Sequence, residues 1–177
     1  AKAEELTRLN SLRKQEEEKI LAQVEEQIRR DPDLLNRRIL IVSGEGWNHG
    51  IIGIASAKLL HKYGKPNIVI TVEGETSRGS ARSFEGLSLF ELLTDCKDLL
   101  IRYGGHTKAA GLTIETEKIP DFIKAAYEYC EKLPPALETL SADMEITPPQ
   151  LTAENIELLE KLEPFGEENP VPLFLFK

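Results

Sequence analysis

Several residue types are scarce in this 177-residue chain, and each scarcity excludes a class of protein. The two cysteines, Cys96 and Cys130, lie far apart and lack partners at metal-ligand spacing, so the sequence predicts neither a disulfide framework nor a zinc site. We expect both thiols to be buried in the apolar core. No apolar run approaches the roughly 20 residues that a membrane helix needs. The charged N-terminus is unlike a signal peptide, and a cytoplasmic protein without membrane contact is expected.

Positive charge is also in the minority. The 22 Lys and Arg residues stand against 30 Asp and Glu residues, which gives a formal net charge of −8 and excludes a uniformly basic nucleic-acid-binding surface. The acid is unevenly spread, because residues 141–177 hold eight acidic and two basic side chains, whereas residues 76–108 hold four acidic and five basic ones. The total charge is therefore compatible with a small basic site in the middle of the chain.

The first half of the chain predicts a long helix followed by a βαβ unit. Residues 1–30 contain no Gly or Pro and place apolar residues at helical spacing, and Asp31-Pro32-Asp33 ends this connector helix. Residues 37–44 and 65–74 are strand-like runs on either side of an amphipathic segment that closes with Gly64. A strand, a helix and a strand of these lengths form a right-handed unit with parallel strands.

The second half adds elements to the same sheet. We expect a returning strand, a mostly helical segment, another strand and an amphipathic helix, at residues 76–84, 87–103, 111–117 and 119–133. The fold class is therefore α/β, with a mixed sheet of about five strands flanked by helices. After Pro134-Pro135 the chain predicts a strand, a short helix with Thr152 as its N-cap, and a final strand.

These signals divide the chain into three parts. Residues 1–36 form the connector helix, and residues 37–135 form the α/β domain. Residues 136–177 are too few to close a core of their own. We expect them to be the truncated start of another domain.

Three motifs are candidates for a binding site, and the first is SGEGWNHGIIGIA at residues 43–55. Its spacing differs from that of a dinucleotide-binding loop, because bulky residues fill its middle. Gly50 and Gly53 favour close packing of the following helix on the sheet. Trp47 either covers an edge of the core or, beside a helix N-terminus, stacks on a nucleic-acid base.

The second motif, RGSARS at residues 78–83, carries two arginines on a predicted strand. Because alternate residues of a strand share a face, Arg78, Ser80 and Arg82 point in one direction. Two guanidinium groups and a hydroxyl on one face suit a phosphate group. The alternative is a solvent-facing strand with ordinary surface charges.

The third motif is RYGGHTKAAG at residues 102–111. Gly104 and Gly105 allow the backbone and the His106 ring to come close to a ligand, and Lys108 adds a positive charge. The alternative is that Gly104 only ends the preceding helix and that His106 is an ordinary surface residue. Three such motifs in one chain favour a phosphate or nucleic-acid site.

In this order, GEGWNHGIIGIASAKLLHKYGKPNIVI, GSARS and RYGGHTKAAGL resemble the DHHA1 domain of the DHH phosphoesterase superfamily, and more closely its RecJ-like single-strand-specific 5′-to-3′ DNA exonucleases. The resemblance covers about residues 5–177 and includes a tail similar to the start of the family's OB-type domain. It implies single-stranded DNA as the partner and a role in DNA repair and recombination. The matching residues, Gly104, Gly105 and His106 with Ser80 and Arg82, are expected to hold the DNA backbone near the scissile phosphate. Asn48 stands where many relatives have histidine.

The resemblance also implies what this sequence does not carry. In the family, an N-terminal domain with a DHH triplet binds two Mn²⁺ or Mg²⁺ ions that activate water for phosphodiester hydrolysis. This chain has no DHH triplet and its six aspartates are scattered, so we expect it to hold no catalytic residue, no metal and no cofactor, and to be inactive alone. A monomer that works with a missing DHH domain is expected.

Two other functions stay open. One is the substrate-binding domain of a small DHH phosphodiesterase that acts on nanoRNA or cyclic dinucleotides, although those proteins generally lack an OB-like continuation such as residues 141–177. The other is a structural interaction module that uses the long charged helix for docking.

Overall fold

The computed structural model describes residues 2–84, 86–134, 141–166 and 168–177, and it divides into two units, Ala1–Glu138 and Thr139–Lys177. The boundary expected at Pro134-Pro135 adjoins residues 135–140, which lie outside the described residues. The larger unit contains the following elements: α1 (Lys2–Arg30), η1 (Pro32–Leu35), β1 (Leu40–Glu45), α2 (Ile52–Tyr63), β2 (Asn67–Glu73), β3 (Thr76–Arg82), α3 (Leu89–Asp95), η2 (Lys97–Leu99), β4 (Leu100–Gly105), β5 (Ala109–Glu115), η3 (Thr116–Lys118) and α4 (Ile119–Glu131).

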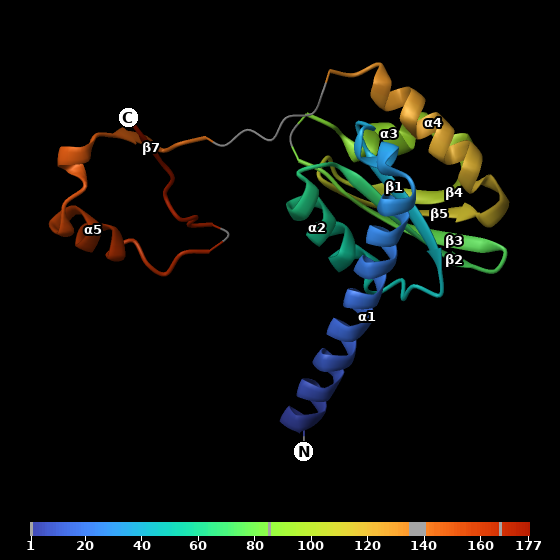
Figure 1. The fold of residues 1–177 in the computed structure, drawn as a ribbon, viewed down its shortest axis with the longest axis horizontal. Coiled ribbons are helices and arrows are strands. Elements are labelled where there is room, and N and C mark those ends of the chain that lie inside the picture. Colours follow the sequence, from blue (N-terminus) through green and yellow to red (C-terminus); the bar gives the residue numbers. More distant parts are fainter. Residues whose placement is uncertain (1, 85, 135–140, 167) are drawn as a thin grey trace. The chain divides into compact units, whose positions relative to one another are not determined.

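A single five-stranded sheet organises this unit, with strand order β1-β2-β3-β5-β4. The pair β1–β2 is parallel, with α2 as the crossover, and the pairs β2–β3, β3–β5 and β5–β4 are antiparallel. Helices α1 and α2 lie on one side of the sheet, and α3 and α4 lie on the other (Figure 1). The α/β class and the mixed sheet with flanking helices are confirmed.

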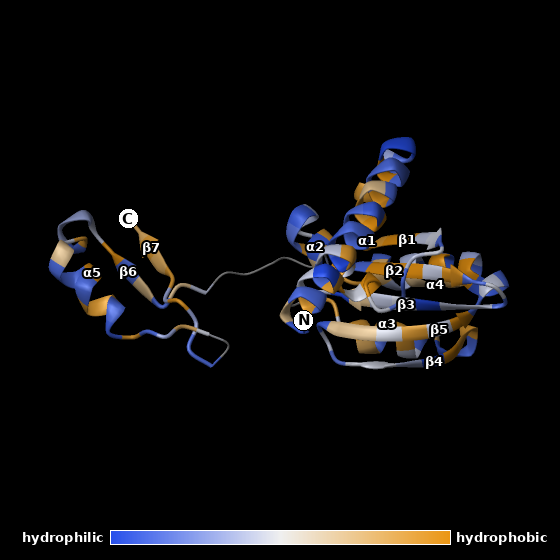
Figure 2. Ribbon diagram, turned by 90° about the horizontal axis from the view of Figure 1, so that it is seen from below, coloured by the Kyte–Doolittle hydropathy of each residue, from blue (hydrophilic) through white to orange (hydrophobic). Residues whose placement is uncertain are grey.

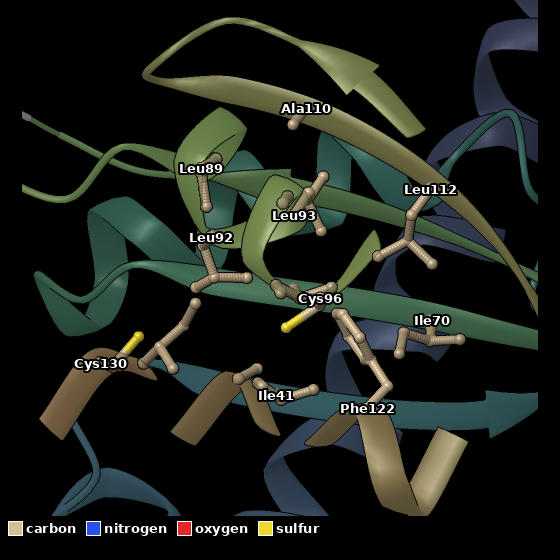
Figure 3. Packing of buried hydrophobic residues seen from close by; sticks show 14 of the residues in the cluster. Ile41, Ile70, Leu89, Leu92, Leu93, Cys96, Ala110, Leu112, Phe122 and Cys130 are labelled. Carbon is tan, nitrogen blue, oxygen red and sulfur yellow. The ribbon is translucent and has the colours of Figure 1, made fainter. Parts of the chain in front are cut away.

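One face of the sheet is covered by α3 and α4. Its core takes alternate residues from four strands, for example Ile41, Ile70 and Ala81, and packs them on leucines of α3 and on Phe122 of α4. Figure 3 shows the side chains of the sheet, α3 and α4 meeting in one layer. Cys96 and Cys130 lie in this layer as free, buried thiols, which confirms the expectation for both. Burial raises the pKa of Cys96 to about 11 and that of Cys130 to about 12, so both stay protonated and unreactive at neutral pH.

The other face is apolar only over β1 and β2. There, Leu40, Val42 and Val69 pack against α2 and against the C-terminal half of α1. On the same face, β3 and β4 carry polar residues and glycine, and both strands appear in pale and blue shades in Figure 2. Helix α2 also reaches over β3, whereas no described helix packs on this face of β5 and β4.

The long helix α1 is fixed to α2 by an ion pair whose carboxylate is buried. Glu17 is 2% exposed and contacts Lys58 of α2 as well as Arg13 one turn earlier. The contact with Lys58 holds the pKa of Glu17 below its usual value, against the opposing effect of burial. The N-terminal half extends away from the sheet (Figure 1) and exposes Leu6 and Leu9, so only the second half of the predicted apolar stripe is buried.

The mostly helical segment expected at residues 87–103 is wrong in its second half. Helix α3 ends at Asp95, and after a short 3₁₀ turn the chain forms the edge strand β4. The apolar run at Leu99, Leu100 and Ile101 suits either a helix or a strand, and pairing with β5 decides for the strand. Gly104 is therefore a strand residue and not the end of a helix.

The smaller unit contains β6 (Met144–Ile146), η4 (Pro148–Gln150), α5 (Ala153–Glu160) and β7 (Phe174–Phe176). The side chain of Thr152 accepts a hydrogen bond from the backbone N–H of Asn155, as expected for an N-cap. Strand β7 pairs in parallel with β6. No helix in the described parts of the chain is long and apolar enough to cross a membrane.

The core layer beneath α4 depends on Phe122, which is fully buried. We expect Phe122→Ala to lower the free energy of unfolding by about 3–5 kcal/mol, because the change leaves a large cavity. Urea unfolding followed by circular dichroism measures this loss. Phe90→Ala, at a site 46% exposed, is the matched control and should cost clearly less. Equal losses in the two variants would contradict the packing described here.

Candidate nucleic-acid interface

A hollow of about 670 Å³ lies on the open part of the sheet. Its floor is formed by β3, β5 and β4, and its wall includes His49 from the turn before α2 and Ile52 from the first position of α2. The hollow exists because α2 covers β2 and β3 while no described helix packs on this face of β5 and β4. An open surface of this size has room for an extended ligand.

The strand register arranges the floor in rows that cross the three strands. Directly opposite residues of antiparallel strands have side chains on the same face, about 5 Å apart. One row contains Ser80, Gly111 and Gly104. The next row contains Arg78, Thr113 and Arg102. The alternation predicted for Arg78, Ser80 and Arg82 is seen in their burial, because these three are more exposed than the alternate residues Ser77, Gly79 and Ala81.

Two glycines of the floor are not needed for packing. A Cβ atom added at Gly104 would meet no atom within 4 Å, and one added at Gly111 would make only an ordinary contact, 3.6 Å from the carbonyl oxygen of Gly79. Neither residue has a positive φ angle. Glycine at these positions therefore leaves space over the floor that the fold itself does not use.

Gly105, in contrast, is required by the backbone. Its φ angle is +141°, and an added Cβ would lie 2.4 Å from the carbonyl oxygen of Ala109. This close approach lets the chain turn into His106, whose backbone N–H donates to the same oxygen at 2.7 Å. The loop that follows is anchored by two further hydrogen bonds, from Ser83 N–H to Lys108 O and from Leu89 N–H to Thr107 O.

The same register brings Arg82 and His106 to one end of the sheet. Arg82 pairs with Ala109 across β3 and β5, and His106 is bonded to Ala109 from the other side. His106 is exposed and Arg82 is half-buried, so neither side chain is sealed in the interior. The structure thus brings together the second and third motifs, which are separated by 18 residues in sequence (84–101).

The Arg82 side chain is held by its own strand and lies close to α2. The guanidinium donates through Nη1 to the carbonyl oxygen of Ala81 at 2.8 Å and to Ser80 Oγ at 3.3 Å. A Cβ atom on Gly53 would lie 3.1 Å from Ser80 Oγ and 3.4 Å from Arg82 Nη2, so glycine allows the helix to pack this closely. The role expected for Gly53 in close packing is confirmed.

The charge of the hollow is locally positive. Among the described residues, no carboxylate forms an ion pair with Arg78, Arg82, Arg102 or Lys108. Most of the basic side chains that do form ion pairs lie on helices. Acidic residues gather beyond the far end of β3 and β5, at Glu75, Glu115 and Glu117. The unpaired guanidinium groups attract an anion, and the acidic end repels it.

Trp47 does not belong to this site, which corrects the expectation that it contacts nucleic acid. Its side chain is 3% exposed and lies in the core between α1, β1 and α2. The indole Nε1–H donates to Gln23 Oε1 of α1 at 2.6 Å, and Thr71 Oγ1–H donates to the Trp47 carbonyl oxygen at 2.6 Å. A ring held in this way cannot stack on a base, and the core-edge alternative holds instead.

Sequence reasoning missed some lining residues. Arg102 was placed on a helix and Thr113 was not considered, because only the pairing of β4 with β5 brings them beside Arg78. His49 lies at the rim, with Nδ1 3.6 Å from Glu73 Oε1. Asn48 shapes the turn before α2, because its side-chain oxygen accepts from Gly50 N–H at 2.8 Å. The only sequence signal for this part of the site was Arg102, a basic residue two positions before Gly104-Gly105.

The described residues do not fit the two-metal chemistry implied by the resemblance. A dinuclear centre needs several carboxylates and imidazoles that converge within a few ångströms. Among the described residues there is no group of three or more His, Cys, Asp or Glu side chains that could hold a metal ion.

Comparison with known families assigns both units. The DHHA1 domain matches residues 36–132, which are 97 of the 177 residues, and the RecJ OB domain matches residues 142–177. The chain belongs to the DHHA1 family. The resemblance proposed from the sequence motifs is thereby confirmed.

Its curated relatives are RecJ proteins described as single-stranded-DNA-specific exonucleases. This chain is 34% identical to the RecJ protein of Bacillus subtilis, and the match covers 78% of this chain. It is also 34% identical to the RecJ protein of Thermus thermophilus, and that match covers 97% of this chain. It spans 18% and 24% of those two proteins. The crystal structure of Thermus thermophilus RecJ in complex with Mn²⁺ superposes with a TM-score of 0.81 at 28% identity, over 97% of this chain and 25% of that one. The Mg²⁺ complex of the same protein gives a TM-score of 0.78.

The hydrogen bond from Trp47 to Gln23 links the rim of the hollow to α1. We expect Gln23→Leu to lower the free energy of unfolding by about 1–3 kcal/mol, because it leaves the buried indole N–H without an acceptor. Trp47 is the only tryptophan, so its fluorescence during urea unfolding reports the change directly. Gln15→Leu, on an exposed part of the same helix, is the control. A Gln23→Leu variant as stable as this control would refute the structural role of the bond.

Proposed function

We propose that this chain is the DNA-holding part of a RecJ-type 5′-to-3′ single-strand-specific exonuclease that acts in DNA repair and recombination. In this proposal, the sheet hollow and the loop at His106 grip the sugar–phosphate backbone, and a DHH domain outside this chain supplies the Mn²⁺ or Mg²⁺ ions and cuts the strand. The chain alone then binds DNA without hydrolysing it. Residues 1–36 act as the connector, residues 37–135 as the holding domain, and residues 136–177 as the start of the OB domain.

The observation that carries this proposal is a bare part of the floor, at Gly104 and Gly111, next to arginines that have no acidic partner among the described residues. Packing would tolerate side chains at Gly104 and Gly111, yet glycine leaves this part of the floor bare. Arg78 and Arg102 line the hollow beside it, and Arg82 is bonded to the lining residue Ser80. None of the three arginines has an acidic partner in the described part of the chain. A bare backbone with flanking guanidinium groups suits a phosphate ester that approaches closely. The net charge of −8 makes this local arrangement the more informative feature.

A single strand fits these residues better than a duplex. A single strand has no paired second strand beside its phosphates. A narrow floor can therefore contact these phosphates directly. With only a few phosphates contacted, the affinity should be modest and should fall as salt rises. The match of residues 142–177 to the RecJ OB domain favours long single-stranded DNA over the dinucleotides of the smaller phosphodiesterases.

Binding of a labelled single-stranded oligonucleotide tests this function. We expect Arg82→Ala and His106→Ala each to weaken binding about 5- to 10-fold at low salt, because each change removes one donor to the DNA backbone. Fluorescence anisotropy in a titration with the 177-residue chain measures the affinity. Lys124→Ala removes one positive charge from α4, on the opposite face of the sheet, and should bind like the unmodified chain. Unchanged binding in both site variants would refute the proposal.

A change on the floor separates binding from folding. We expect Gly104→Val to bind single-stranded DNA at least 10-fold more weakly while its melting temperature stays close to that of the unmodified chain, because its side chain fills only open space. Gly105→Val is the contrasting variant, and it should lose stability because its side chain collides with Ala109 and Ala110. Anisotropy and thermal unfolding measured together give the result. Tight binding by a well-folded Gly104→Val chain would show that the DNA does not touch the floor.

A further inference from the structure

A second row of donors lies beside the glycine row on the floor of the hollow. It consists of Arg78 on β3, Thr113 on β5 and Arg102 on β4. Arg78 and Arg102 are both exposed and flank Thr113, which is half-buried. Neither arginine contacts a carboxylate in the part of the chain that the structure describes.

The spacing of this row suits one phosphate group. Neighbouring strands are about 4.8 Å apart, so the Cα atoms of Arg78 and Arg102 are separated by roughly 10 Å. Two long side chains at that distance can both reach an anion placed over the middle strand. The Thr113 hydroxyl lies below that point and can donate a further hydrogen bond.

The distance between the two rows suits successive phosphates. Residues two apart on an antiparallel strand are about 6.8 Å apart, which separates the Ser80–Gly104 row from the Arg78–Arg102 row. Adjacent phosphates of an extended single strand have a similar separation. A strand that lies along β3 and β5 therefore places one phosphate over each row.

The acidic residues set a limit to this path. Glu75, Glu115 and Glu117 lie beyond the second row, around the turn between β2 and β3 and the end of β5. A third phosphate in the same direction would meet these carboxylates. The hollow thus holds a short length of chain, with the first row nearest to His106 and the second row nearest to the acidic end.

We propose that Arg78, Thr113 and Arg102 form a second phosphate subsite, in which the two arginines clamp a single phosphate that is adjacent to the one held by Ser80 and Arg82. This inference rests on the proposed function, because it takes a nucleic-acid backbone as the ligand. It makes the hollow selective for a chain of at least two consecutive phosphodiesters over a ligand with one.

A pair of double-mutant cycles tests the clamp. The ligand is labelled oligo-dT of eight nucleotides, and its affinity is measured by anisotropy between low and moderate salt. We expect Arg102→Ala and Arg78→Ala each to weaken binding about 5- to 10-fold and to reduce the slope of log affinity against log salt by about 0.7. The double variant should lose little more than either single variant, because both arginines hold the same phosphate.

The second cycle combines Arg102→Ala with Arg82→Ala. These residues belong to different rows, so their losses should add. Lys124→Ala serves again as the charge control, and the melting temperature of each variant shows that the fold is kept. Additive losses for Arg78 and Arg102 would overturn the shared subsite.

The outcomes distinguish the two levels of the proposal. Normal binding by Arg102→Ala with weak binding by Arg82→Ala would remove the second subsite and leave the DNA-holding function intact. Normal binding by all of these variants would remove both. A loss in Arg102→Ala that Lys124→Ala reproduces would reveal a general charge effect and would also overturn the subsite.

Discussion

The architecture depends on a change from apolar to polar residues along one face of the sheet. The pleat requires each strand to satisfy two environments at once. Toward α3 and α4, strands β1, β2, β3 and β5 all contribute to a continuous apolar layer. Toward α1 and α2, the apolar residues stop after β2, and the face continues with arginine, serine, threonine and glycine. The hollow is therefore the unburied continuation of a face whose other part is core.

This division explains why α1 contributes to the site although it lies over the opposite half of the sheet. Its C-terminal half completes the apolar layer with Ile20 and Val24 and is fixed to α2 through Glu17. Through Gln23 it also holds Trp47, and through Gln27 it bonds the carbonyl oxygen of Ser43 at 2.8 Å. The first contact holds the segment between β1 and His49, and the second holds β1 itself, so the connector helix helps to position the rim of the hollow.

Local sequence signals predicted most of the sheet but only part of the site. The βαβ unit was readable because Gly64 and the strand-like runs before and after α2 are local features, and Gly64 adopts the left-handed conformation that ends the helix. The alternation at Arg78, Ser80 and Arg82 was readable for the same reason. Strand β4 was not predicted because it is defined by pairing with β5, which no short stretch of sequence encodes. For the same reason, Arg102 was not predicted as a site residue. Trp47 was ambiguous because an indole near a helix start suits both a core and a ligand, and only the position of α1 decides.

The adjacent residues Gly104 and Gly105 of the third motif are glycines for two different reasons. Gly105 is explained by the protein itself, since its backbone angle and its approach to Ala109 exclude a side chain. Gly104 lies one residue earlier, has an ordinary strand conformation and faces open space, so folding does not explain it. A residue that costs conformational entropy without a gain in packing requires another cause. Gly104 lies in a row with Ser80, beside arginines that have no acidic partner in the described part of the chain, and the DNA-holding function proposed above would explain it by the close approach of an anionic chain. The same function would account for a basic floor on a protein of net negative charge.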